Sequence, residues 1–156
     1  MAVNTSNAEG GLTIRPMSPS DAKQAAELSG ELGYAATTEA MYTRLLQLAD
    51  LRDHVVYAAC LDGEVVGWID VGIVHHLQSP PYGEIGGLVV SGSHRGRGIG
   101  KKLVGMAEQW ITGKGVTTIL VRSQLVREAA HRFYLEQNFC RAKTSAVFTK
   151  QIISSC

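Results

Sequence analysis

The sequence predicts an α/β fold in which strands and helices build one mixed sheet. Residues 85–90 form a short apolar strand, and after a glycine-rich turn residues 99–111 repeat apolar side chains every three or four positions, which is helical spacing. A further apolar strand follows at 116–121, and this strand–helix–strand order implies a right-handed parallel crossover. Upstream, residues 55–61 and 64–74 are predicted to be two strands joined by a tight turn, so antiparallel and parallel pairs should share the sheet.

Length and composition favour a globular domain. The chain has 156 residues, of which 45% are hydrophobic and 19% charged, and we expect one domain over residues 11–156 after a flexible stretch at 1–10. The net charge of +1 gives no general attraction for nucleic acid or a membrane surface. The sequence contains neither a run long enough to cross a bilayer nor the basic and apolar regions of a signal peptide, so we expect a cytoplasmic protein.

The cysteines and histidines do not predict a metal site. Cys60, Cys140 and Cys156 are odd in number and widely spaced, which fits neither a disulfide framework nor a zinc site. Cys60 and Cys140 lie in apolar runs typical of strands, so we expect buried, unreactive thiols there. His75 and His76 are adjacent and would point to opposite faces of a strand, without a carboxylate or thiol at ligand spacing.

The N-terminal part of the chain should form a strand and two helices. Residues 12–15 alternate as a strand does, and Ser18 can cap a helix that has Asp21 in the capping-box position. Gly33 should end that helix, and a second helix is expected over residues 38–51. The residues Gly33-Tyr34-Ala35-Ala36 connect the two helices.

Two short glycine-containing sequences predict a turn and an irregularity in the middle strands of the sheet. Asp62-Gly63 predicts a two-residue hairpin turn between the strands on either side of it. Gly86-Gly87 inside an apolar strand indicates a bulge or a close backbone approach.

The last part of the chain should add a helix and two strands. A helix begins near Arg127, and Asn138 can take the left-handed conformation that ends it. Residues 139–142 and 146–152 are predicted to form a closing pair of strands. The expected total is about seven strands and about four helices.

The turn between the core strand and its helix has the composition of a phosphate-binding loop. Its glycines alternate and cations surround them: Arg95, Gly96, Arg97, Gly98, Gly100 and Lys101. Unpaired N–H groups and the dipole make the start of a helix positive, and glycine lets a phosphate approach the backbone. A Walker A loop would need glycine at Arg95 and Ser or Thr at Lys102, and a dinucleotide fingerprint would need glycine at Lys101, so both patterns fail.

The pattern that does fit is Arg-x-x-Gly-x-Gly at Arg95, Gly98 and Gly100. It closely resembles the acetyl-CoA pyrophosphate loop of the GNAT N-acetyltransferase superfamily, and the resemblance extends over residues 12–152. The resemblance implies acetyl-CoA as co-substrate and a sheet whose central parallel pair splays apart, so that the pantetheine arm lies in the gap. It places the Leu88 N–H on the thioester oxygen. It also implies that the connection Gly33-Tyr34-Ala35-Ala36 is a candidate substrate loop. The co-substrate residues so implied are Leu88, Val89, Val90, Arg95, Gly96, Arg97, Gly98, Ile99, Gly100 and Lys101.

A second stretch resembles the other GNAT signature, Asn-x-x-Ala-x-x-Phe-Tyr-x-x-x-Gly-Phe. Here it begins with Arg127 in place of asparagine and continues with Ala130, Phe133 and Tyr134, with Asn138 in place of glycine. The match adds Arg127, Ala130 and Phe133 to the implied co-substrate residues. The family's asparagine contacts the pantetheine arm, and the role of Arg127 in its place stays open. The match implies that Tyr134 protonates the departing thiolate, for which a phenol is a suitable donor.

The candidate general base is Glu84, at the entry of the core strand. Among aminoglycoside-type members of the family a glutamate at this place lies in the acceptor cleft. Protein N-terminal acetyltransferases of the family carry their glutamate on the next strand, and no acid occurs between Val116 and Arg127 here. Asp70, on the preceding strand, is a further acidic candidate for binding a cationic amine.

The sequence therefore predicts an acetyl-CoA-dependent N-acetyltransferase that moves the acetyl group directly to a primary amine, without a metal. The acceptor is expected to be a small amine or an aminoglycoside-like molecule. A protein amine acceptor and a non-catalytic acyl-CoA sensor are the alternatives. Dimers are common in the family, and the sequence has no distinctive dimer signal, so a homodimer stays an open expectation.

Overall fold

The computed structural model describes residues 6–7 and 11–153. The chain divides into two compact units, Met1–Arg122 and Ser123–Cys156. The expectation of a single domain over residues 11–156 therefore stays a prediction. Within the stretch expected to be flexible, residues 6–7 form a short strand, and the other residues up to 10 lie outside the described part.

A six-stranded mixed sheet is the centre of the first unit, and its strands lie side by side in chain order. Its strands are β1 (Ser6–Asn7), β2 (Leu12–Pro16), β3 (His54–Leu61), β4 (Glu64–Val74), β5 (Tyr82–Val90) and β6 (Ile119–Val121). The neighbours from β1 to β5 pair antiparallel, whereas β5 and β6 pair parallel. The predicted mixed sheet with a parallel pair is confirmed, but the described sheet has six strands instead of about seven, and the parallel pair lies at its edge instead of its centre because no described strand follows β6.

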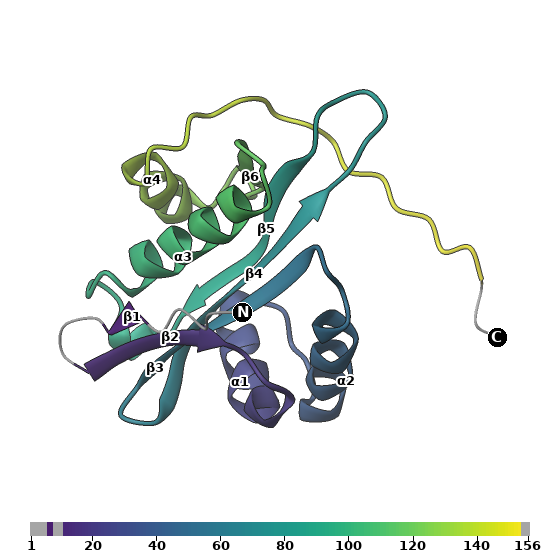
Figure 1. The fold of residues 1–156 in the computed structure, drawn as a ribbon. Coiled ribbons are helices and arrows are strands. Elements are labelled where there is room, and N and C mark those ends of the chain that lie inside the picture. Colours follow the sequence, from purple (N-terminus) through teal and green to yellow (C-terminus); the bar gives the residue numbers. More distant parts are fainter. Residues whose placement is uncertain (1–5, 8–10, 154–156) are drawn as a thin grey trace. The chain divides into compact units, whose positions relative to one another are not determined.

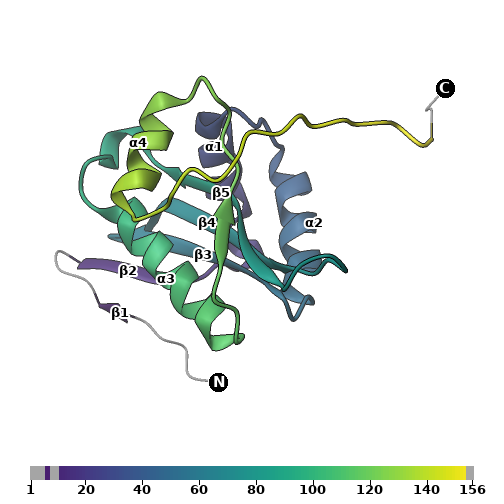
Figure 2. The ribbon, with the colours of Figure 1, turned by 90° about the horizontal axis from the view of Figure 1, so that it is seen from above.

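Three helices cover the two faces of this sheet (Figures 1 and 2). Helices α1 (Ala22–Leu32) and α2 (Thr38–Ala49) lie on one face, and α3 (Ile99–Gly113) lies on the other. Neighbouring residues of β4 show the two faces: a Cβ at Gly67 would lie 3.4 Å from Leu103 of α3, whereas the Trp68 indole N–H donates to the Ala25 carbonyl of α1 at 3.3 Å. In the part of the chain that the structure describes, no helix is long and apolar enough to span a bilayer.

The predicted hairpin turn and the predicted end of the first helix form where the sequence places them, whereas Ser18 caps a short 3-10 turn (Pro19–Asp21) and α1 begins after it. Asp62 and Gly63 both have positive φ, at 50° and 82°, which matches the twist that a two-residue hairpin needs. Gly33 ends α1 in the left-handed conformation with φ at 98°. These signals depend on backbone angles that few residues tolerate, which is why they can be recognised without a structure.

The expected bulge lies in β5 at Gly86. Asp70 of β4 pairs with Gly87 and Val71 pairs with Ile85, so Gly86 is the extra residue between them. A Cβ at position 86 would lie 2.5 Å from a carboxylate oxygen of Asp70. Glycine is therefore required at this point because the Asp70 side chain occupies the space above it.

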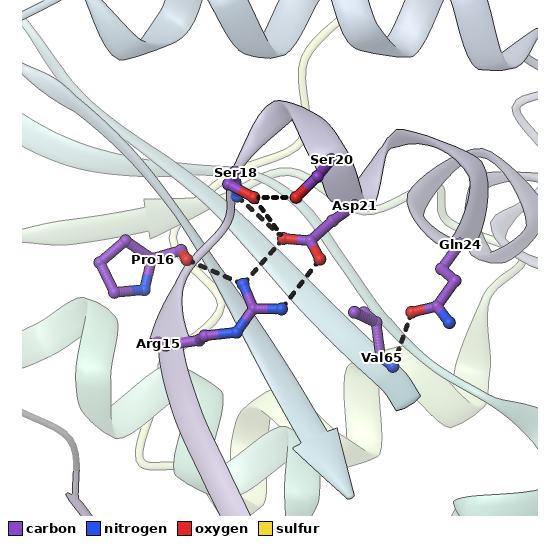
Figure 3. Close-up of polar contacts among 7 residues, drawn as sticks. All are labelled: Arg15, Pro16, Ser18, Ser20, Asp21, Gln24 and Val65. Atoms are coloured by element: carbon purple, nitrogen blue, oxygen red, sulfur yellow. Dashed lines mark hydrogen bonds and ion pairs between the residues drawn. The ribbon is translucent and has the colours of Figure 1, made fainter. Parts of the chain in front are cut away.

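An ion pair fixes the entry of the chain into α1 (Figure 3). Both terminal nitrogens of Arg15 donate to the Asp21 carboxylate at 2.8 Å, and the Ser18 N–H donates to the same carboxylate at 2.9 Å. Farther along the helix, Gln24 accepts a hydrogen bond from the Val65 N–H at 2.9 Å. The bonds from Arg15 are the main cause that holds the pKa of Asp21 below its usual range.

Replacing Asp21 with Asn should lower the free energy of unfolding at neutral pH. We expect a loss of about 1–2 kcal/mol, below the full value of two charge-assisted bonds because solvent reaches Arg15. A carboxylate with a depressed pKa stabilises the fold above its unfolded pKa, near 3.8, and this contribution is lost as the pH falls through the lower folded value. Urea unfolding should therefore show a gap between wild type and variant at neutral pH that closes in strong acid.

Asp50→Asn is the matched control, since Asp50 is exposed and forms no ion pair within the described residues. It should leave the unfolding free energy near that of wild type at both pH values. A gap for Asp21→Asn that persists unchanged in strong acid would contradict the assignment.

The second unit contains α4 (Glu128–Glu136), the last of the four α-helices in the described chain. Asn138 follows it with φ at 68°, as expected for a left-handed cap. The Tyr134 ring makes edge-on contacts with Phe133 and Phe139, with ring centroids 5.3 Å and 5.5 Å apart. These aromatic contacts hold the end of the helix against the residue that follows its cap.

The predicted closing strands at 139–142 and 146–152 do not form. These residues have no regular structure, and Val147 and Phe148 are 78% and 92% exposed. Apolar and β-branched side chains suit a strand only when a partner strand supplies hydrogen bonds and packing, and residues 139–153 show no such pairing. Cys140 is accordingly exposed, contrary to the expected buried thiol, whereas Cys60 is buried as expected; Cys156 lies outside the described residues.

Candidate functional site

The glycine-rich turn ends at an uncapped helix N-terminus. Gly96 and Gly98 both have φ at 78°, and Gly98 is the N-cap of α3, where it offers no side chain to the first turn. The first N–H that bonds back along the helix is that of Lys102, which donates to the Gly98 carbonyl at 3.1 Å. The preceding N–H groups of α3 have no partner within the helix and are free to bind an anion.

Three exposed cations surround this N-terminus: Arg95, Arg97 and Lys101. Arg95 lies next to the end of β5, because its Nε donates to the Val90 carbonyl at 3.4 Å. Ile99 is buried at 3% exposure and anchors the first turn in the core. The turn therefore combines positive charge, free N–H groups and a fixed helix, which together suit a phosphate.

One edge of β5 is open beside this turn. Strand β6 pairs only with residues 83–85 of β5, so the bulge and the residues beyond it have no described partner on that side. The Ser91 N–H donates to Val66 of β4 at 2.8 Å. Because N–H groups alternate in direction along a strand, those of Leu88 and Val90 point away from β4 toward the open edge. Val89 points its side chain into the core instead, at 4% exposure.

The residues of the second predicted signature all lie in the second unit. Arg127 precedes α4 as its N-cap, and Ala130, Phe133 and Tyr134 lie within the helix. Burial raises the pKa of Tyr134, and the positive charge of Arg127 opposes that rise. Tyr134 therefore keeps its proton at neutral and moderately alkaline pH, as a proton donor must.

Glu84, the predicted base, lies on β5 opposite Gly72. Its side chain is 28% exposed, and its carboxylate lies 3.7 Å from Nε of Arg122. Arg122 follows β6, so the ion pair spans the parallel strand pair. Glu84 keeps access to solvent, but it does not line the pocket between the sheet and helices α1 and α2.

A pocket of about 400 Å³ lies between the sheet and helices α1 and α2, and we call it the α1–α2 pocket. Its volume is in the range of sites for small molecules. The lining is mostly apolar, with a few polar groups: Met17, Ala25, Ser29, Leu32, Tyr34, Met41, Arg44, Leu45, Leu48, Val56, Trp68, Asp70, Gly86 and Gly87. Tyr34, from the predicted substrate loop, lines this pocket and is 65% exposed.

Asp70 lines this pocket and is held by a histidine that the sequence analysis missed. His54 Nε2 is hydrogen-bonded to Asp70 Oδ1, and the two form an ion pair when the ring is protonated. The His54 ring lies over Gly72, where a Cβ would be 2.9 Å from its Nδ1. Gly72 thus leaves room for the ring on β4, as Gly86 leaves room for the carboxylate on β5.

The adjacent histidines His75 and His76, which were not expected to bind a metal, contact other side chains. Among the residues that the structure describes, no cluster of three or more His, Cys, Asp or Glu side chains has the arrangement of a metal site. His75 instead contacts Asp53 at 3.1 Å, and His76 contacts the Tyr82 hydroxyl at 3.1 Å.

Comparison with known proteins identifies the family. Residues 23–139 match the model of the acetyltransferase (GNAT) family. The chain is 34% identical to an aminoalkylphosphonate N-acetyltransferase of Salmonella typhimurium, over 72% of this chain and 71% of the relative. It is 31% identical to an aminoglycoside N(6')-acetyltransferase type 1 of Stenotrophomonas maltophilia, over 76% of this chain and 80% of the relative.

The fold has a counterpart among solved structures. An aminoglycoside N-acetyltransferase solved in complex with CoA superposes with a TM-score of 0.80 and 20% identity, and the match covers 90% of this chain and 95% of that one. At this identity the likeness concerns the fold. The fold, the matched family model and the curated relatives agree, and this chain belongs to the acetyltransferase (GNAT) family.

Proposed function

We propose that this acetyltransferase moves the acetyl group of acetyl-CoA to the primary amine of a small molecule, in one step while both substrates are bound. The observation that carries the proposal is the uncapped N-terminus of α3 beside the open edge of β5. A pyrophosphate fits free N–H groups surrounded by Arg95, Arg97 and Lys101. An extended amide-containing arm fits a strand edge whose backbone groups lack partners.

The residues along this edge have separate roles in the proposal. The Leu88 N–H donates to the thioester oxygen as negative charge develops on it, and the backbone of Val90 pairs with the amides of the arm. Gly96, Gly98 and Gly100 leave room for the phosphates, and Ile99 fixes the helix below them. Both substrates are thereby held together, which supplies proximity.

Two side chains would move the protons. The amine must lose a proton before it can attack, and Glu84 accepts that proton through a water molecule. The bond between the acetyl carbon and sulfur breaks as the C–N bond forms, and Tyr134 gives its proton to the departing thiolate. The raised pKa of Tyr134 supports the second role, because the phenol stays protonated at the pH of turnover.

The acceptors named for the curated relatives support a small molecule. One relative acts on aminoalkylphosphonates and another on aminoglycosides, and both groups carry primary amines. The α1–α2 pocket has a volume suited to such an acceptor, and Asp70 places a carboxylate in it.

The test is release of CoA thiol from acetyl-CoA in the presence of a panel of amines, with mass spectrometry of the product. We expect at least one small amine to gain a single acetyl group well above background hydrolysis. In the same assay Glu84→Gln should change the pH at which the rate rises, because the variant lacks the base. Binding of acetyl-CoA without turnover of any amine would reject the enzymatic proposal, and absence of acetyl-CoA binding would reject the assignment of the α3 loop.

A further inference from the structure

We propose that the α1–α2 pocket selects amines that also carry an acidic group, a phosphonate or a carboxylate. The inference rests on the proposed function and narrows its substrate class. Asp70 would hold the ammonium end of the acceptor, and Arg44 would hold the acidic end.

The charges in the pocket lining are balanced. It contains one acidic side chain, Asp70 from β4, and one basic side chain, Arg44 from α2. The rest of the lining is apolar or aromatic apart from the hydroxyls of Ser29 and Tyr34, and no other charged side chain takes part. A ligand that leaves neither charge unmatched has one positive and one negative group.

Asp70 is prepared to receive a cation. Its Oδ1 is hydrogen-bonded to His54, whereas its Oδ2, which fills the space over Gly86, has no hydrogen-bond partner among the described residues. The hydrogen bond to His54 fixes the orientation of the carboxylate before any acceptor arrives. A fixed carboxylate binds an ammonium group with less loss of side-chain entropy than a free one.

Arg44 is free to receive an anion. It lies exposed on α2 and forms no ion pair within 4.0 Å with any carboxylate in the described residues, Asp70 included. A guanidinium binds a carboxylate or phosphonate through two parallel hydrogen bonds, a geometry that neither a hydroxyl nor an amine reproduces. The pocket therefore offers a specific contact for an acidic group.

Other acceptor classes fit this pocket less well. A polycationic aminosugar would bring several ammonium groups against one carboxylate, with Arg44 repelling the rest. A simple diamine would place its second cation near Arg44. A neutral amine would bind through Asp70 alone and gain nothing from Arg44.

The experiment uses a matched acceptor series on one short alkyl chain: the aminoalkylphosphonate, the amino carboxylate, the amino alcohol and the diamine. Initial rates with acetyl-CoA give kcat/KM for each. We expect the phosphonate or the carboxylate to exceed the alcohol by about tenfold or more, and the diamine to be poorest. The ratio between the first two identifies which acidic group the pocket prefers. A diamine or an aminoglycoside that exceeds both acidic acceptors would overturn the inference.

Two variants separate the ends of the acceptor. Arg44→Gln should lower kcat/KM about tenfold for the acidic acceptors, mainly through KM, and leave the amino alcohol unchanged. Asp70→Asn should lower it for every acceptor, because all of them carry the amine. Arg52→Gln, which removes a guanidinium outside the pocket lining, is the control. An equal effect of Arg44→Gln on all acceptors would contradict an anion contact.

Binding by calorimetry keeps this inference distinct from the proposed function. If no amine is acetylated, the enzymatic proposal fails, but the pocket can still be tested without catalysis. The wild-type chain should then bind the aminoalkylphosphonate or the amino carboxylate more tightly than the amino alcohol, and Arg44→Gln should remove the difference. Equal affinities in the wild-type chain would overturn the inference whether or not the chain turns over.

Discussion

Tyr134→Phe is expected to lower kcat by about 100-fold or more, the usual effect of removing a general acid. Without the phenol the thiolate must leave unprotonated or take a proton from water. Phenylalanine retains the ring, so the contacts with Phe133 and Phe139 persist and the helix should keep its fold. Steady-state kinetics, together with calorimetry of acetyl-CoA binding, measures the two effects separately: kcat falls and the dissociation constant stays near that of wild type.

The pH profile adds a readout that a purely structural role would not change. Burial raises the pKa of Tyr134 above the ordinary value of 10.0, so the wild-type rate should fall only above that pH, and the fall should be absent in the variant. Tyr42→Phe removes a hydroxyl from an exposed tyrosine on α2 and serves as the matched control. An unchanged kcat in Tyr134→Phe would remove this residue from the mechanism.

Leu103→Ala is expected to lower the free energy of unfolding by about 2–5 kcal/mol. Leu103 lies on α3 with no exposed surface, and it packs against β4 at Gly67. Truncation removes its apolar contacts and leaves a cavity in a core that cannot fully collapse. Because a domain has only about 5–15 kcal/mol of stability, urea unfolding should show a large shift of the midpoint.

Gln109→Ala provides the comparison on the same helix, since Gln109 is exposed. It should change the unfolding free energy by no more than about 0.5 kcal/mol, as is usual for surface substitutions. If Leu103→Ala lowers the free energy of unfolding no more than this control does, that result would contradict the packing of α3 against the sheet.

The backbone features of this fold could be predicted because single residues determine them. The turn at Asp62-Gly63, the helix end at Gly33 and the cap at Asn138 all need positive φ, and all three appear as expected. The bulge at Gly86 was also predictable from its glycine pair, although the reason for it, the Asp70 carboxylate above, was not. The phosphate-type loop belongs to the same class, because Gly96 and Gly98 take the left-handed conformation at the start of α3.

The hydrogen bond between His54 and Asp70 could not be predicted by counting from the hairpin turn, because it depends on His54 lying opposite Gly72 of β4. Leu61 pairs with Glu64 and Cys60 with Val65, but a register shift follows and Ala59 pairs with Gly67. Counting without that shift pairs His54 with the wrong residue of β4, and a slip of one residue moves a side chain to the other face of the sheet. The one trace of the His54 position in the sequence is Gly72, which leaves room for the ring.

The closing strands failed for a different reason. Their apolar pattern describes what a strand would tolerate, whereas strand formation depends on a partner that local sequence cannot specify. Val147 and Phe148 are exposed because their segment has the apolar pattern of a strand but no neighbouring strand to pair with in the described residues. Helix α4 was predictable in the same unit because its hydrogen bonds are internal to the segment.

The chain-order arrangement of the strands has a consequence for folding kinetics. The strands β3, β4 and β5 follow one another through short connections, so this part of the sheet can assemble by successive short-range closures. Two other pairs must wait for helical connections: β2–β3 closes across α1 and α2 and forms five residue pairs, whereas β5–β6 closes across α3 and forms only three. Of these two closures, the one that creates the open edge beside the phosphate loop should therefore be lost earlier on unfolding.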